Sequence, residues 1–248
     1  MAVSYTHLNR KEKPLISTLI DLLYPHRCPV CHGIVSSKGQ LVCPGCRGKL
    51  SYVTEPVCKK CGKEVDDDKE EYCPGCRKRM PGFRRQIALF NYNEAVKSSM
   101  MKFKYNNKRE YADFYIEELL RLHGRDLQEM RIQAIVPVPV HSSRRRERGY
   151  NQSEVLARRL GRRLKIPVYP HALIRTRKTL PQKGLGSAGR LHNLEKAISW
   201  GRCARLPGTV LLIDDIYTTG ATMEACARAL KKAGVREIYC VSICIGEI

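Results

Sequence analysis

The chain has 248 residues, of which 43% are hydrophobic and 28% are charged, and it carries a formal net charge of +21 at pH 7. This composition excludes a disordered or collagen-like chain, and no apolar run approaches the roughly 18 residues that a membrane-spanning helix needs. The first residues also lack the basic-then-apolar order of a secretory signal, so we expect a cytoplasmic protein without a transmembrane segment. At about 150 residues per domain, this length predicts one large domain or two unequal ones.

Basic residues are concentrated in one part of the chain. Residues 141–190 carry 14 Lys and Arg side chains but only 2 Asp and Glu, which is more than half of the whole positive excess. Localised positive charge raises the local concentration of anions. We therefore expect an anionic partner, either the phosphates of a small ligand or a nucleic-acid backbone. The alternative is a solvated basic face with no specific partner.

The first 80 residues combine a short helix with a duplicated cysteine pattern. Apolar residues between Leu15 and Leu23 recur at helical spacing and predict an amphipathic helix within residues 1–24. Residues 25–80 then contain four CxxC pairs, and both halves of this segment read C-x2-C-x11-C-x2-C, so that each cysteine recurs 30 residues later. The pairs are Cys28 with Cys31, Cys43 with Cys46, Cys58 with Cys61, and Cys73 with Cys76.

This pattern predicts a double zinc ribbon with two structural Zn²⁺ ions. Two CxxC pairs supply the four thiolates that zinc takes at about 2.3 Å, and four cysteines leave no coordination position for water. A cytosolic chain does not keep disulfides, and a redox-active dithiol would not occur in four copies. We favour sequential pairing within each quartet over a cross-braced arrangement, and we expect His26 and His32 to be bystanders. The other four cysteines are expected to be buried, inert thiols: Cys203, Cys226, Cys240 and Cys244.

Residues 81–248 predict an α/β domain. Apolar runs predict strands at residues 86–92, 134–140, 166–170, 209–215 and 237–245. Helical patterns cover residues 93–105, 112–124, 151–164 and 221–234, with Gly124 and Gly234 as expected helix ends. Strands that alternate with helices form a largely parallel sheet, and ligands of such sheets bind at the carboxyl ends of the strands.

The residues best suited to chemistry lie in VLLIDDIYTTGAT, residues 210–222. Four apolar residues form a buried strand, Asp214 and Asp215 follow, and a loop of small residues opens the next helix. Such a loop exposes backbone N–H groups at the positive end of the helix dipole and so binds anions, and Gly220 lets the backbone approach a ligand closely. Two carboxylates would repel a phosphate, so we expect them to accept hydrogen bonds from sugar hydroxyls or to help hold a divalent ion.

This motif resembles the phosphoribosyl-pyrophosphate (PRPP) signature of type I phosphoribosyltransferases, whereas no Walker A loop and no dinucleotide fingerprint occur. The resemblance implies that Asp214 and Asp215 contact the ribose 2′- and 3′-hydroxyls as the catalytic pair, and that PRPP binds together with Mg²⁺. It assigns phosphate binding to the loop residues Tyr217, Thr218, Thr219, Gly220, Ala221 and Thr222. The alternative is an acidic strand end capped by a Thr-rich turn.

The segment IVPVPVHSSRRRERGYNQ, residues 135–152, extends the resemblance to the ComF family of competence-related, phosphoribosyltransferase-like proteins. The resemblance covers nearly everything after residue 14. It implies a type I phosphoribosyltransferase-like parallel sheet flanked by helices and preceded by a small zinc-ribbon domain. It also implies a pyrophosphate loop after residues 134–140 and a flexible loop at residues 175–193 that closes over PRPP. The residues that it assigns to these loops are Arg144, Arg146, Arg148, Asn151, Gln152, Gln182 and Arg190.

Two functional hypotheses follow from the resemblance. In the first, the protein acts in DNA uptake during natural transformation: a PRPP-type pocket handles incoming single-stranded DNA or its nucleotides, and proteins of the competence machinery are partners. In the second, it is an active Mg²⁺-dependent phosphoribosyltransferase of nucleotide metabolism whose acceptor the sequence does not identify. We favour the first and leave catalysis open. The acidic pair favours a sugar-phosphate ligand in either case, because Asp214 and Asp215 would repel a DNA backbone.

Overall fold

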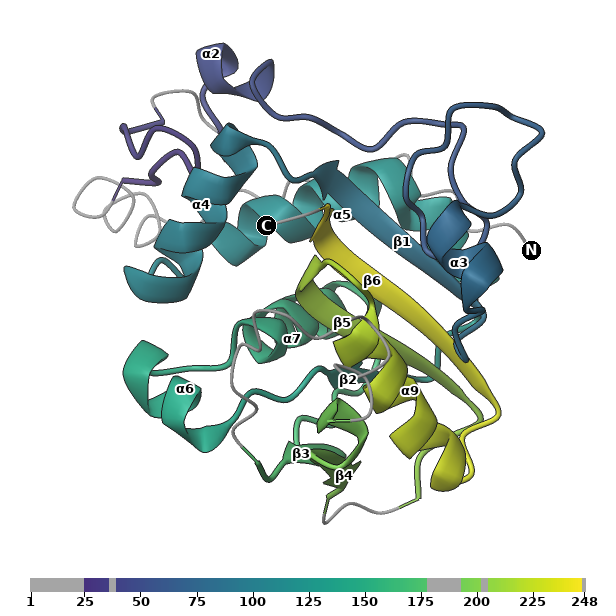
Figure 1. Ribbon diagram of the computed structural model, residues 1–248. Coiled ribbons are helices and arrows are strands. Elements are labelled where there is room, and N and C mark those ends of the chain that lie inside the picture. The colour runs from purple at the N-terminus through teal and green to yellow at the C-terminus, as the bar shows by residue number, and fades with distance from the viewer. Residues whose placement is uncertain (1–24, 36–38, 178–192, 202–204, 247–248) are drawn as a thin grey trace.

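The computed structural model describes residues 25–35, 39–177, 193–201 and 205–246 (Figure 1). Its main sheet contains four parallel strands in the order β1-β6-β5-β2. Their bounds are Arg85–Asn91 for β1, Ala134–Pro137 for β2, Thr209–Tyr217 for β5 and Glu237–Ile245 for β6. The predicted parallel α/β sheet is confirmed. Residues 166–170 contribute only one isolated bridge, between Val168 and Ile135, instead of the expected strand.

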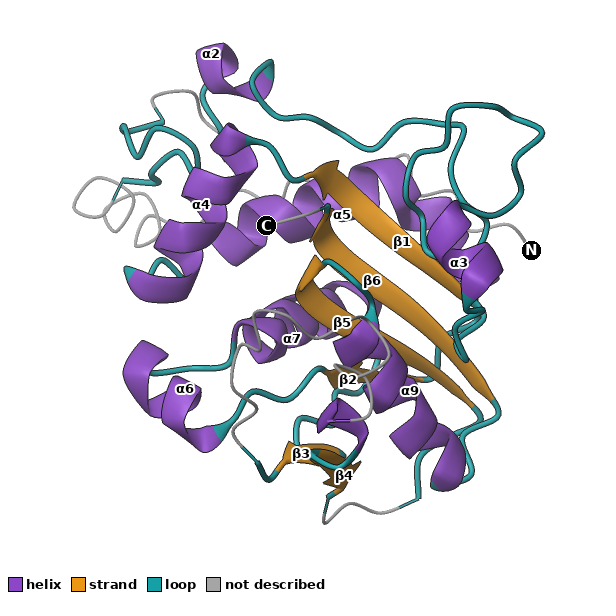
Figure 2. Ribbon diagram, in the orientation of Figure 1, coloured by secondary structure: helices purple, strands orange, loops and turns teal. Residues whose placement is uncertain are grey.

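Helices cover both faces of this sheet (Figure 2). The longer ones are α4 (Glu94–Tyr105), α5 (Tyr111–Glu129), α7 (Gln152–Leu164) and α9 (Ala221–Lys232). The shorter ones are α2 (Pro44–Arg47), α3 (Pro74–Lys78) and α6 (Ser142–Arg148). The predicted helix end at Gly124 lies next to a break in α5, because His123 has a non-helical φ of −121° and ψ of 17°. A second helical stretch, which was not predicted, then continues to Glu129. No helix within the described ranges is long and apolar enough to cross a lipid bilayer.

A second, two-stranded sheet pairs β3 (Leu173–Arg175) with β4 (Ile198–Trp200) in antiparallel register. The sequence analysis did not predict it, because strands of three residues are too short to show a periodicity. These strands flank most of the segment in which the resemblance places the flexible loop. Gln182 and Arg190 lie outside the described residues, and so does the predicted helix within residues 1–24.

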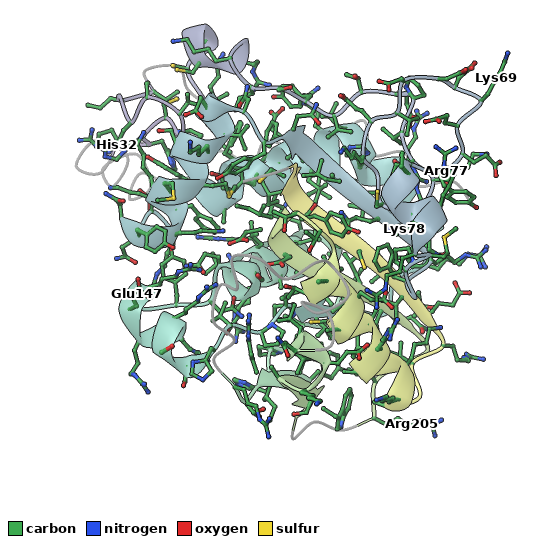
Figure 3. All side chains as sticks on the ribbon, in the orientation of Figure 1. His32, Lys69, Arg77, Lys78, Glu147 and Arg205 are labelled. Carbon is green, nitrogen blue, oxygen red and sulfur yellow. The ribbon has the colours of Figure 1, made fainter. Side chains whose placement is uncertain are left out.

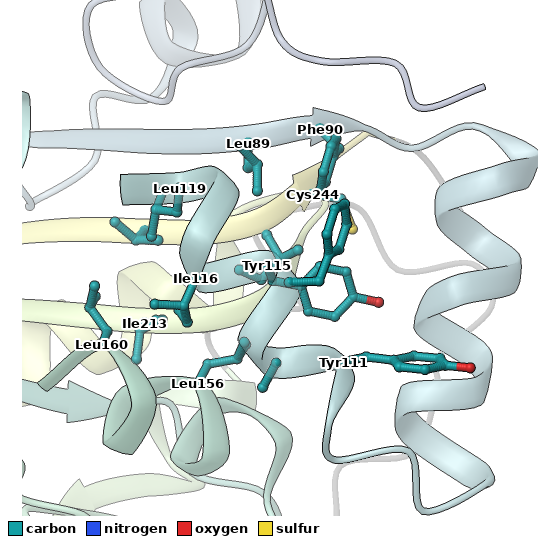
Figure 4. Packing of buried hydrophobic residues seen from close by; sticks show 14 of the residues in the cluster. Leu89, Phe90, Tyr111, Tyr115, Ile116, Leu119, Leu156, Leu160, Ile213 and Cys244 are labelled. Carbon is teal, nitrogen blue, oxygen red and sulfur yellow. The ribbon is translucent and has the colours of Figure 1, made fainter. Parts of the chain in front are cut away.

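The main sheet separates two clusters of buried hydrophobic residues. Successive strand residues point to opposite faces, so Leu211 and Ile213 of β5 face one cluster, whereas Val210 and Leu212 face the other. We call the first side the α5 face, which α4, α5 and α7 cover, and the second the α9 face, which α9 and the β3–β4 pair cover. Figure 4 shows the α5 face, where helix residues such as Tyr115 and Leu156 pack against the strands.

The N-terminal part of the chain contacts both faces. Residues 51–53 run antiparallel along the outer edge of β1, where Tyr52 pairs with Phe90 and the Val53 N–H donates to the Leu89 carbonyl at 3.1 Å. This segment connects the first ribbon, residues 28–46, to the second ribbon, residues 58–76. Cys28 and Cys46 of the first ribbon belong to the cluster on the α5 face. All four cysteines of the second ribbon belong to the cluster on the α9 face: Cys58, Cys61, Cys73 and Cys76.

Candidate functional site

Two groups of four cysteines form the metal sites that the spacing predicts. In each group the four Sγ atoms lie within 4.8 Å of one another, and each group comes from one ribbon. The sequential pairing is therefore confirmed. Neither His26 nor His32 belongs to a potential metal-binding group in the described part of the chain, and the His32 ring nitrogen Nδ1 instead lies 2.6 Å from the Tyr111 hydroxyl.

Backbone hydrogen bonds favour the thiolate form at one cysteine of each quartet, while burial raises the pKa of Cys46 and the hydrogen bond with Cys76 raises that of Cys61. Burial alone would raise the pKa of the Cys28 thiol, but hydrogen bonds from backbone N–H groups, the largest from Cys43, lower it to about 7. Cys58 shows the same balance, and the N–H of Cys61 contributes most to lowering its pKa to about 7. Four thiolates complete the tetrahedral shell of Zn²⁺. Both donor sets therefore fit structural zinc and leave no position for a substrate.

The remaining cysteines that the structure describes are buried, as expected: Cys226, Cys240 and Cys244. Burial is the main cause that raises their pKa values, so they are poor nucleophiles and poor metal ligands at neutral pH. Cys203 lies outside the described residues.

The acidic pair lies at the carboxyl end of β5, and its two members have different partners. Asp214 accepts hydrogen bonds from the Ser153 hydroxyl at 2.8 Å and from the Asp215 N–H at 2.9 Å. Asp215 instead forms an ion pair with Lys104 near the end of α4, with Nζ and Oδ2 3.1 Å apart and only 14% and 11% of the two side chains exposed. The sequence analysis missed Lys104 and Ser153, which tertiary packing alone brings to the acids.

The environment of Asp214 makes it titrate near neutral pH. Burial raises the pKa of its carboxyl to about 7, and the negative charge of Asp215 acts in the same direction. The Ser153 hydrogen bond and the positive charge of Lys104 oppose this rise. Two adjacent carboxylates resist joint ionisation, and Lys104 relieves that repulsion.

The loop after the acids begins α9. Thr218 and Thr219 are exposed, and Gly220 caps the helix with a φ of 74°, a left-handed conformation that favours glycine. Ala221 and Thr222 occupy the first turn of the helix, so the backbone N–H groups of this region lie at the positive end of the helix dipole. The Tyr217 side chain differs from its neighbours, because it is buried in the cluster on the α9 face.

The polar residues after β2 divide into two groups. Asn151 and Gln152 are buried: the Asn151 side chain donates to the Val138 carbonyl at 3.0 Å, and Gln152 accepts from Arg148 at 3.1 Å. Arg148 also donates to the Tyr105 hydroxyl at 2.9 Å. Arg148 therefore attaches the loop to the end of α4, while Asn151 attaches it to the residue that follows β2. By contrast, Arg144 and Arg146 on α6 are exposed and form no ion pair with any residue that the structure describes.

Ion pairs neutralise much of the basic helix α7. Arg158 pairs with Glu154 of the same helix at 2.8 Å, while Arg159 and Arg163 pair with Asp113 and Glu117 of α5. The positive charge available to an anionic ligand is therefore greater on α6 than on α7. Figure 3 shows charged side chains projecting from α6, where Glu147 is labelled.

Two family models match separate parts of this chain. Residues 19–78 match the double zinc ribbon domain, and residues 151–246 match the phosphoribosyl transferase domain. A purine phosphoribosyltransferase structure from Pyrococcus horikoshii Ot3 is 18% identical with a TM-score of 0.34, and the match covers 53% of this chain and 83% of that one.

Three curated relatives carry names that refer to competence or DNA. Competence protein F of Haemophilus influenzae is 33% identical over 65% of this chain and 72% of that protein. DNA utilization protein YhgH of Escherichia coli K12 is 28% identical over 67% of this chain and 74% of that protein. Competence protein ComFC of Bacillus subtilis is 30% identical over 61% of this chain and 60% of that protein. With its double zinc ribbon and its phosphoribosyltransferase-like sheet, this chain belongs to the ComF family.

Proposed function

We propose that this protein binds PRPP, or another ligand with a phosphoribosyl group, at the carboxyl ends of β5 and β2, and that this binding serves DNA uptake or utilization. The observation that carries the proposal is the junction of β5 and α9. Asp214 is partly exposed there and Asp215 is buried, and after two further residues Thr218 and Thr219 form an exposed loop that leads through Gly220 into the N-terminus of α9. One sugar phosphate satisfies both parts, since its hydroxyls bind carboxylates and its phosphate binds N–H groups.

In this proposal, each part of the site contacts a different part of the ligand. Asp214 and Asp215 accept hydrogen bonds from the ribose hydroxyls, and residues 218–222 bind the 5′-phosphate. Arg144 and Arg146, two of the exposed arginines of α6, contact the diphosphate. Bound Mg²⁺ supplies further positive charge to the diphosphate oxygens. Lys104 balances the charge of Asp215 before the ligand arrives.

Calorimetric titration of the full-length, zinc-loaded protein with PRPP and Mg²⁺ tests this proposal. We expect micromolar binding, about 8 kcal/mol, that depends on Mg²⁺. The double variant Asp214→Asn with Asp215→Asn should bind at least tenfold more weakly while its circular dichroism spectrum stays unchanged. A matched control is Asp67→Asn with Asp68→Asn, an adjacent and exposed acidic pair near the tip of the second ribbon. Equal binding by the Asp214/Asp215 variant, or no binding by the wild type, would contradict the proposal.

A surface next to this site supports single-stranded DNA as a second ligand. The Tyr105 ring at the end of α4 is 49% exposed, and the Arg148 guanidinium lies over it, 4.8 Å from the ring centroid. Arg144 and Arg146 add exposed positive charge on α6. Proteins that bind single strands combine such aromatic platforms with basic grooves. The names of the relatives, competence protein and DNA utilization protein, agree with a DNA ligand.

Fluorescence anisotropy with labelled oligo-dT tests this second ligand. Replacing Tyr105→Ala removes a stacking platform, which is worth about 1–3 kcal/mol per base, so we expect at least fivefold weaker binding. Leu122→Ala is the control, because Leu122 is also a large exposed hydrophobic residue but lies on α5. Unchanged affinity of the Tyr105 variant would remove this surface from the proposal.

A further inference from the structure

The second ribbon lies against the proposed phosphate loop. A cavity of about 720 Å³ has Cys61, Cys73 and Cys76 of the second quartet on one side and residues 217–221 on the other. Figure 1 shows α3, which carries Cys76, on the same side of the sheet as α9. One metal site and the loop that is proposed to bind the phosphate are therefore neighbours in space.

Tyr217 occupies the space between the second quartet and this loop. Its side chain is only 8% exposed and belongs to the same buried cluster as all four cysteines of the quartet. Burial raises the pKa of the Tyr217 hydroxyl, and the nearby thiols of Cys61 and Cys76 act in the same direction. On its other side the ring lies against the loop, because a Cβ atom on Gly220 would be 2.6 Å from the ring carbon Cζ.

A second connection joins the same two regions. Glu224, in the first turns of α9, is buried, and its Oε2 accepts a hydrogen bond from the Gly82 N–H at 2.6 Å. Gly82 lies six residues after Cys76, the last cysteine of the second ribbon. The first ribbon lacks this proximity, because its buried cysteines, Cys28 and Cys46, pack in the cluster on the opposite face of the sheet.

We propose that Tyr217 is a positioning residue that couples zinc occupancy of the second site to the shape of the phosphate loop. The inference rests on the proposed function of that loop. Zinc fixes the four thiolates and with them one wall of the space that holds the Tyr217 ring. The ring in turn supports Gly220 and sets the direction of the N–H groups at the start of α9. A ligand binds more tightly to groups that are already held in place.

Such coupling is reciprocal. If zinc in the second site strengthens ligand binding, the ligand must strengthen zinc binding in that site by the same factor. The first site, on the opposite face, should not respond to the ligand. This asymmetry separates coupling through Tyr217 from a general stabilisation of the protein by either metal or ligand.

The experiment measures chelator-driven zinc release from the full-length protein, with and without saturating PRPP and Mg²⁺. The variant Cys31→Ser, which lacks the first site, assigns the two phases of release. In the wild type we expect the ligand to slow release from the second site at least threefold and to leave the first site unchanged. Tyr217→Leu should abolish this protection and weaken PRPP binding at least fivefold, whereas Tyr217→Phe, which keeps the ring, should retain most of both.

Tyr111→Leu is the matched control, because Tyr111 is a buried tyrosine close to the first quartet. It should leave the effect of PRPP on the second site unchanged. A wild type that binds PRPP but releases the second zinc equally fast with and without it overturns the coupling, whether or not the variants fold. Equal PRPP affinity and equal protection in Tyr217→Leu overturn it as well. A wild type that does not bind PRPP overturns the proposed function and the coupling together.

Discussion

The two cysteine quartets have the same spacing but lie in different surroundings. In the first, Cys31 is exposed and Cys43 is only partly buried, whereas all four cysteines of the second are buried. The first contributes to the cluster on the α5 face and the second to the cluster on the α9 face. A duplicated motif therefore repeats the metal ligands and their chemistry, while the segments around each copy determine which face of the sheet that metal site packs against.

The two ribbons are also attached in different ways. Glu118 of α5 binds the part of the chain next to the first quartet through side chains, with its carboxylate 3.0 Å from Arg47 and 2.7 Å from the Tyr52 hydroxyl. In the second ribbon the sheet bonds to the backbone inside the quartet itself, because the Gln86 N–H of β1 donates to the carbonyl of Lys60, between Cys58 and Cys61, at 2.8 Å. The backbone bonds of residues 51–53 to β1 lie outside the first quartet. We therefore expect the second ribbon to be part of the cooperative unit of the sheet and the first to be able to open locally.

The largest expected effect comes from breaking one quartet at a time. Cys61→Ser should destabilise the whole chain by about 4 kcal/mol or more, because it removes a buried zinc ligand from the core of the α9 face. Cys31→Ser, at the exposed position of the first quartet, should cost less than half as much. Thermal unfolding followed by circular dichroism, with zinc content measured by mass spectrometry, checks both variants. Equal losses would refute the difference between the two sites.

The acidic pair gives the next largest effect. Lys104→Met leaves Asp215 as a largely buried carboxylate without its partner, and breaking a buried pair costs about 3–5 kcal/mol. Denaturant unfolding measures this loss of stability, and adding Asp215→Asn should restore part of it, because the neutral amide no longer needs a positive partner. Lys97→Met is the control, because Lys97 forms only an exposed pair with Glu94 on the same helix. Equal losses of stability in Lys104→Met and Lys97→Met would contradict the role of Lys104.

The sequence reveals the cysteine quartets and the two acids more readily than it reveals the residues that contact the acids. Cysteine spacing and the order of Asp214, Asp215 and the Thr-Thr-Gly loop are local patterns, so the sequence predicts the zinc sites and the candidate pocket residues. Lys104 and Ser153 reach the acids only through tertiary packing and carry no local signal. Gly124 marks the break in α5 at His123, but the helical stretch that continues beyond it to Glu129 was not predicted. The burial of Tyr217 was also hidden, because its neighbours Thr218 and Thr219 are exposed.

A smaller effect concerns the pH dependence of PRPP affinity, which we expect to come from Asp214. Burial raises the pKa of Asp214 to about 7, and hydrogen bonds from ribose hydroxyls favour the ionised form. The ligand therefore binds with release of a proton, and PRPP affinity should rise about tenfold between pH 6 and pH 8 and then level off. Calorimetry at several pH values measures how PRPP affinity changes with pH. The single variant Asp214→Asn shows how much of that pH dependence comes from other groups. A pH dependence that is the same in Asp214→Asn and in the wild type would contradict the assignment of the released proton to Asp214.

We expect the smallest effects when the glutamates next to the two ribbons, Glu118 and Glu224, are each replaced by glutamine. Glu118→Gln should lower the free energy of unfolding by about 1–2 kcal/mol, because a neutral glutamine makes weaker hydrogen bonds with Arg47 and Arg121. The loss stays small because about half of each arginine side chain is exposed to water. Burial would raise the pKa of Glu118, but hydrogen bonds from Arg121, Tyr52 and Arg47 lower it. This stabilisation is therefore present above the ordinary glutamate pKa and is lost as the pH falls through the lowered pKa.

The two glutamates should differ in their effect on the ligand. Glu118→Gln should leave PRPP affinity unchanged, because the first ribbon packs on the opposite face from Tyr217. Glu224→Gln should weaken binding about threefold, because Glu224 connects the second ribbon to the start of α9. Parallel titrations and denaturant unfolding of the two variants measure both properties. Equal effects on affinity would remove the distinction between the faces.

Hydrogen exchange followed by mass spectrometry, with and without PRPP and Mg²⁺, tests most directly where the ligand binds. The account predicts that the ligand slows exchange in residues 214–224 and 138–153, and leaves the first ribbon, residues 28–46, unchanged. Slower exchange confined to the ribbons, or no change at residues 214–224 under saturating ligand, would contradict a phosphoribosyl site at the carboxyl ends of β5 and β2.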